Sequence, residues 1–91
     1  MTTKAIELYE LGISYYLDDE KWRKLPNYKR WDTTYDYFIK AKEEGFIETD
    51  EIPTWGLNYS TYLREYKEKK YISISFLISQ CEWLQSIAKR P

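Results

Sequence analysis

The residues best suited to chemistry lie between positions 21 and 31. This stretch carries five positive charges and no acid within eleven residues, and aromatic side chains stand between the charges. Cationic groups beside aromatic rings suit two kinds of partner, namely nucleic acids, through phosphate contacts and base stacking, and acidic protein surfaces. The candidate partner-binding residues are Lys21, Trp22, Arg23, Lys24, Tyr28, Lys29, Arg30 and Trp31.

The charge of the whole chain favours the protein partner. The sequence has 14 basic and 15 acidic residues, with a net charge of −1, whereas nucleic-acid-binding domains are usually basic. We therefore expect another protein with an acidic surface as the partner, and keep a small nucleic-acid-binding protein that uses residues 21–31 as the alternative. A third interpretation is structural: Trp22 and Trp31 cover a small core while the charges face water.

The sequence contains few of the residue combinations that catalyse reactions. The absence of His excludes Ser-His and Cys-His nucleophile pairs, and a single Cys cannot form a zinc cluster. The three glycines stand too far apart to form a phosphate-binding loop. We expect no enzyme activity, no cofactor and no metal, and we expect Cys81 to be a small buried residue on a helix face.

Length and composition predict one small domain, residues 1–91, in the cytoplasm. The lone Cys81 cannot form an intrachain disulfide, and no secretory apolar segment stands at the N-terminus. The longest apolar run, residues 72–78, is interrupted by Ser73 and Ser75 and is too short to cross a membrane.

Two predicted helices flank the basic stretch and must position it. The one with the more clearly marked ends is expected from Thr33 to Glu44. Asp32 or Thr33 can cap its first turn, and apolar residues recur along it at three- and four-residue steps. Gly45 can take the left-handed conformation that ends a helix, and Phe46 can fold back over the last turn.

The second such segment is a helix expected from Lys4 to Leu17, capped by Thr2 or Thr3. Its apolar stripe is wide, so we expect it to be covered on more than one side. Residues 18–30 would then connect the two helices.

A third helix is expected to begin at Thr49 or Asp50 and to end in the charged run 65–70. Pro53 is tolerated in its first turn. Its apolar face would comprise Trp55, Tyr59, Tyr62, Leu63 and Tyr66.

The C-terminal segment, residues 71–90, fits two patterns. Alternation of Ile72, Ile74, Phe76 and Ile78 is typical of a strand, whereas a face through Ile74 and residues 77, 78, 81 and 84 is typical of a helix. We expect a helix, because a lone strand lacks a partner for its backbone hydrogen bonds. The alternative is a strand that pairs with a segment near Ile47 or with a second copy of the chain.

An internal similarity relates the two halves of the sequence. Residues 11–15 resemble residues 55–59, 44 positions later, and residues 38–41 resemble residues 83–86, 45 positions later. Each half then has a large apolar residue, Gly and an aromatic residue, followed by an aromatic-aliphatic-x-small pattern. Self-similarity at such a period is typical of stacked helix pairs.

On these residues the chain resembles the tetratricopeptide superfamily. Gly12 with Tyr15, and Gly56 with Tyr59, stand where that family has its first-helix Gly and Tyr. The resemblance implies that Gly12 lies close to residues 38–41 and Gly56 close to residues 83–86. Its second-helix aromatic and small residues correspond to Phe38 with Ala41 and Trp83 with Ser86, and its terminal proline to Pro91. The period of 44–45 departs from the family's 34.

The predicted fold is therefore all-α, with four helices in two antiparallel hairpins, either tetratricopeptide-like or an ordinary four-helix bundle. The resemblance implies a non-enzymatic protein-binding module, such as an adaptor, inhibitor or immunity-type factor. Two repeats leave an end face uncovered and aromatic residues make up 19% of the chain, so we also expect a homodimer.

Overall fold

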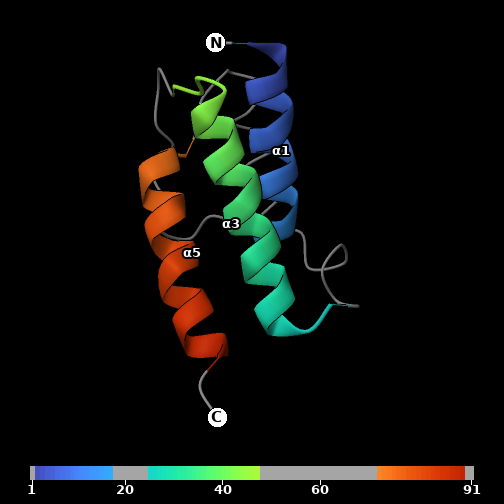
Figure 1. Ribbon diagram of the computed structural model, residues 1–91, viewed down its shortest axis with the longest axis vertical. Coiled ribbons are helices and arrows are strands. Elements are labelled where there is room, and N and C mark those ends of the chain that lie inside the picture. Colours follow the sequence, from blue (N-terminus) through green and yellow to red (C-terminus); the bar gives the residue numbers. More distant parts are fainter. Residues whose placement is uncertain (1, 18–24, 48–71, 90–91) are drawn as a thin grey trace.

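The computed structural model describes residues 2–17, 25–47 and 72–89, and its elements are helices (Figure 1). These are α1 (Thr3–Leu17), α3 (Asn27–Glu43) and α5 (Ile74–Ala88). Helix accounts for 82% of the described residues, which contain no strand. The all-α prediction is confirmed.

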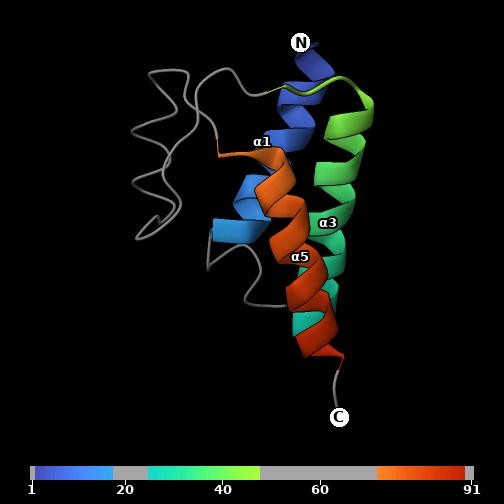
Figure 2. The ribbon, with the colours of Figure 1, turned by 90° about the vertical axis from the view of Figure 1, so that its left-hand side faces the viewer.

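The helix α3 packs against both α1 and α5 and runs antiparallel to each (Figures 1 and 2). The predicted arrangement of four helices in two antiparallel hairpins is wrong, because the described part of the chain has three helices and α3 is shared between the other two. A single helix can serve two neighbours when it presents apolar side chains on more than one side.

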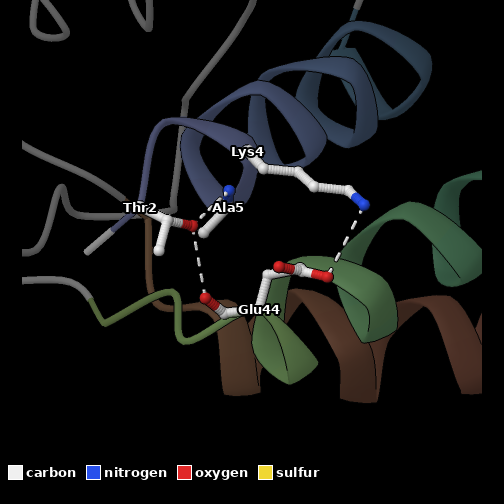
Figure 3. Close-up of polar contacts among 4 residues, drawn as sticks. All are labelled: Thr2, Lys4, Ala5 and Glu44. Carbon is white, nitrogen blue, oxygen red and sulfur yellow. Dashed lines mark hydrogen bonds and ion pairs between the residues drawn. The ribbon is translucent and has the colours of Figure 1, made fainter.

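The first helix begins at a cap that also contacts the end of α3 (Figure 3). The Thr2 hydroxyl oxygen accepts a hydrogen bond from the Ala5 backbone N–H at 3.1 Å, as expected for a capping Thr. The same hydroxyl lies 3.4 Å from the carbonyl oxygen of Glu44, to which it donates, and Lys4 Nζ lies 3.7 Å from Glu44 Oε1. The predicted helix over residues 4–17 is confirmed, and Thr2 provides its cap.

The helix α3 begins six residues before the predicted start at Thr33. Pro26 precedes its first turn with a φ of −58°, and its carbonyl oxygen accepts from the backbone N–H groups of Lys29 and Arg30. Asp32 and Thr33 therefore lie inside the helix and do not cap it. Proline near a helix start is a recognised signal, because the missing N–H has no partner there in any case. The predicted connection over residues 18–30 is thus too long.

The predicted end of this helix is confirmed. Gly45 has a φ of +92°, in the left-handed region, and its N–H donates to the Lys42 carbonyl at 3.0 Å. The Phe46 N–H donates to the Ala41 carbonyl at 2.9 Å. These two bonds form a Schellman motif, which turns the Phe46 side chain into the core.

The C-terminal segment is a helix, so the strand alternative is wrong. The Ser73 side chain accepts a hydrogen bond from the Phe76 N–H at 3.4 Å and caps α5. The buried residues of α5 recur with the period of a helix: Ile74, Leu77, Ile78 and Cys81. No described helix has both the length and the apolar character needed to cross a membrane.

Aromatic rings contact one another in the core between the helices, beside mainly aliphatic residues. The Tyr9 ring stacks on Phe46 with 4.1 Å between centroids, and both Tyr9 and Tyr16 contact Phe38. A Cβ atom added to Gly12 would lie 2.5 Å from the ring of Phe38, so α1 approaches this ring closely because it has glycine there. The predicted contact of Gly12 with the 38–41 stretch is confirmed.

Several predictions lie outside the described residues. These are the third helix from Thr49 or Asp50 to Lys70, the close approach at Gly56, and the basic residues Lys21 to Lys24. Because the second copy of the 11–15 motif is among them, the internal repeat stays a prediction.

Candidate functional site

The first turn of α3 holds the described half of the basic-aromatic stretch. Tyr28 and Lys29 are exposed, whereas Arg30 is buried and Trp31 is half-buried. The stretch is therefore divided: two consecutive side chains face solvent and the next two face the protein.

Arg30 is bound to the end of α1. Its Nε donates to the Tyr15 carbonyl at 3.0 Å, and one terminal NH2 nitrogen donates to the Tyr16 carbonyl at 2.7 Å. The last carbonyls of a helix lack backbone partners, and the helix dipole favours a cation there. The Arg30 backbone carbonyl in turn accepts from the buried Thr34 hydroxyl at 2.7 Å.

Trp31 contacts both Arg30 and the end of α1. The Arg30 guanidinium carbon lies 4.0 Å from the centroid of the Trp31 ring, within the range of a cation–π interaction. The Trp31 ring also meets Tyr16 edge-on, with 6.0 Å between centroids. The sequence alone did not show that this arginine caps a helix, because its target carbonyls lie 14 and 15 residues earlier in the chain.

A second surface, which the sequence analysis missed, lies on the outer side of α5. Among its exposed residues Trp83 is 58%, Ile87 40% and Phe76 37% exposed. Glu82 is the only charged residue in the 15 residues of this helix, in a chain of which 32% is charged. We call this surface the outer α5 face; it comprises Ser75, Phe76, Ser79, Glu82, Trp83, Ser86 and Ile87.

The spacing of Phe76, Trp83 and Ile87 could have revealed this surface. These residues are seven and four positions apart, as on one side of a helix. In the sequence, Trp83 belongs to the internal repeat and Phe76 to a strand-like alternation, and neither pattern indicates that the two residues share a face.

Two titratable groups near Arg30 have raised pKa values: the buried Cys81 thiol and the half-buried Tyr16 hydroxyl. Burial raises the pKa of the Cys81 thiol to about 12; the Arg30 charge lowers it in part, and Glu82 raises it. Burial likewise raises the pKa of Tyr16, with Cys81 acting in the same direction and Arg30 against it. A thiol with such a pKa has almost no thiolate near neutral pH. The expected buried position of Cys81 is confirmed.

Metal chemistry has no visible support in the described residues. They contain no group of three or more His, Cys, Asp or Glu side chains arranged to hold a metal ion.

Comparison with known proteins leaves the family open: no protein-family model, curated protein or solved structure matches this chain. The resemblance to tetratricopeptide repeats therefore stays a prediction.

Proposed function

We propose that this protein is a non-enzymatic binding module for another protein, acting as an adaptor, inhibitor or immunity-type factor. The observation that carries the proposal is the exposure of Tyr28 beside Lys29 on a first turn that Arg30 and Trp31 hold in place. Tyrosine is enriched in protein interfaces because it brings a large contact area with few rotatable bonds.

The fixed position of this turn favours binding. Side chains on a pre-organised backbone lose less conformational freedom when a partner binds. Lys29 adds a positive charge, so the partner surface would be acidic at the point of contact. The buried, largely protonated thiol of Cys81 supports the non-enzymatic part of the proposal.

A cytoplasmic location belongs to the same proposal. It rests on the single cysteine, which leaves the chain without an intrachain disulfide. Fractionation of the native host, followed by detection of the chain, tests this location.

Capture from the native host tests the function. We expect a tagged chain to retain a protein that the double variant Tyr28→Ala/Lys29→Glu loses. Lys40→Glu, which reverses an exposed charge farther along α3, should keep it. A partner retained equally by the double variant would contradict the proposal.

Nuclease digestion and salt separate the two partner classes. A bound protein should survive digestion and should weaken only moderately with salt. Loss on digestion, together with a steep fall of affinity with salt, would instead favour the nucleic-acid alternative.

A further inference from the structure

The outer α5 face is continuous and nearly uncharged. At about 100° per residue, its seven exposed residues cover about 140° of the helix circumference. The buried residues of α5 occupy the opposite side and pack in the core. This face therefore points away from the other helices, and in Figure 2 α5 lies in front of them.

The large and small residues of this face lie on opposite edges. The helical positions place Phe76, Trp83 and Ile87 along one edge, and Ser75, Ser79 and Ser86 with Glu82 on the other side of the face. Of the serines, Ser79 lies closest to the middle. One edge thus projects large apolar side chains, and the other offers small side chains between which large ones can pack.

The exposed surfaces of the other helices differ. The exposed residues of α3 are mostly charged: Lys29, Asp36, Lys40, Lys42 and Glu43, beside Tyr28. A partner that recognised α5 through charge would find only Glu82. The outer α5 face therefore suits a partner that is itself apolar and weakly charged.

We propose that the occupant of this face is the same face of a second copy of the chain, with the two α5 helices side by side and parallel. A two-fold axis parallel to the helices exchanges the two edges, so the large edge of each copy meets the small edge of the other. Two-fold pairs of this kind are isologous, since each copy contributes the same residues.

Parallel pairing also separates the charges of the face. The two Glu82 carboxylates would lie on opposite sides of the two-fold axis, at the solvated rim. In an antiparallel pair both would lie on the same side, and the large edges would meet each other. Complementary shape and separated charge therefore both favour the parallel arrangement.

This self-association involves a surface other than Tyr28 and Lys29, and neither proposal depends on the other. Sedimentation equilibrium at high micromolar concentration should give about twice the monomer mass of 11.2 kDa. Trp83→Glu and Ser79→Arg should each give the monomer mass while keeping the helical circular dichroism, because both positions are exposed. Lys40→Glu on α3 should stay dimeric.

Disulfide trapping tests the orientation. Ser79 and Ser86 are seven residues apart, so they lie about 10.5 Å apart along the same side of α5. In the parallel pair each faces its own counterpart, so Ser79→Cys and Ser86→Cys should each form a covalent dimer on mild oxidation. The wild-type chain is the control, because Cys81 is buried and should not react.

Three results would overturn the proposal. A monomeric wild-type chain would mean that something else covers this face. A dimer that persists in Trp83→Glu and Ser79→Arg would mean that another surface pairs. Cross-linking at only one of the two serine positions would indicate an antiparallel pair, because only the residue beside its axis meets its own counterpart.

Discussion

At the scale of single residues, the close contact between Gly12 and Phe38 restricts which residue position 12 can hold. An added Cβ would lie 2.5–3.0 Å from three atoms of the ring. The ring is fully buried against Tyr9 and Tyr16, so it has little room to move aside. Glycine at this position is therefore required by packing, although it lowers helix propensity.

Replacing Gly12 should destabilise the fold. Gly12→Ala gains up to about 1 kcal/mol of helix propensity, but overpacking typically costs about 1–3 kcal/mol. We expect a lower urea midpoint for Gly12→Ala and a still lower one for Gly12→Leu, whereas Lys40→Leu on an exposed position should not lower it. Phe38→Leu should cost less in the Gly12→Ala background than alone, because it relieves the clash. A midpoint that rises in Gly12→Ala would show that the ring adapts.

The raised pKa of the Cys81 thiol predicts that the fold loses stability at high pH. This pKa rises from 9.0 to about 12 in the folded protein, and Tyr16 shifts in the same direction. Between these values the unfolded chain releases a proton that the folded chain keeps, so the free energy of unfolding falls as pH rises. Well below pH 9 both states stay protonated and the thiol contributes no pH dependence.

Urea midpoints at about pH 8 and about pH 10.5 measure this effect, since stability changes only where the two states bind different numbers of protons. The midpoint should fall between these pH values, and it should fall less in Cys81→Ala. If the urea midpoint fell equally in the wild type and in Cys81→Ala, the thiol would not be responsible for the loss of stability.

At the scale of elements, contacts between α1 and α3 link the end of each helix to the start of the other. Thr2 joins the start of α1 to the end of α3, and Arg30 joins the start of α3 to the end of α1. The Thr2 and Lys4 contacts are exposed and contribute little, as is usual for surface pairs. Arg30 is buried and binds two carbonyls, so it is the stronger connection.

Removing Arg30 should loosen the end of α1. Arg30→Ala leaves the Tyr15 and Tyr16 carbonyls without this donor and removes the stack on Trp31. The cost should be on the order of 2 kcal/mol, because hydrogen bonds from a charged group are worth about 1.5–3 kcal/mol. Hydrogen exchange should accelerate at the amides of the last turn of α1, whereas Lys29→Ala should change neither quantity. Unchanged exchange in Arg30→Ala would contradict this capping role.

Local signals predict some helix boundaries and leave others open. The ends marked by Thr2 and Gly45 were predictable, because caps act over three or four residues. The start of α3 was not, since Asp32 looks like a cap yet accepts from the Gln85 amide at 2.8 Å and pairs with Lys89 at 3.3 Å. Those partners are more than fifty residues away, and only the folded chain brings them together.

The same reasoning applies to the candidate binding residues. The sequence grouped Tyr28, Lys29, Arg30 and Trp31 by type, but burial separates them into two exposed and two inward-facing residues. The sharing of α3 between two helices was also hidden, because periodicity shows that a face is apolar without showing which element covers it.

At the scale of the whole molecule, one side chain connects distant parts of the chain. The Tyr9 hydroxyl donates to the Ile72 carbonyl at 3.0 Å and accepts from the Ile72 N–H at 2.9 Å. Both groups are buried, and 63 residues separate them in sequence. The hydroxyl thus satisfies the backbone where the chain enters α5.

Tyr9→Phe should therefore destabilise the whole fold rather than one helix. It removes one oxygen but leaves two buried backbone groups without this partner, and each such group costs about 1–3 kcal/mol. The stacked contact with Phe46 would persist, since the ring remains. We expect the free energy of unfolding to fall by roughly 2–4 kcal/mol, a large part of the total stability of about 5–15 kcal/mol that is typical of proteins.

Tyr37→Phe is the matched control, because its half-buried ring has no hydroxyl hydrogen bond among the described residues. Global unfolding by circular dichroism and hydrogen exchange across α5 should shift together in Tyr9→Phe. A change confined to α5 would show that this helix unfolds independently of α1.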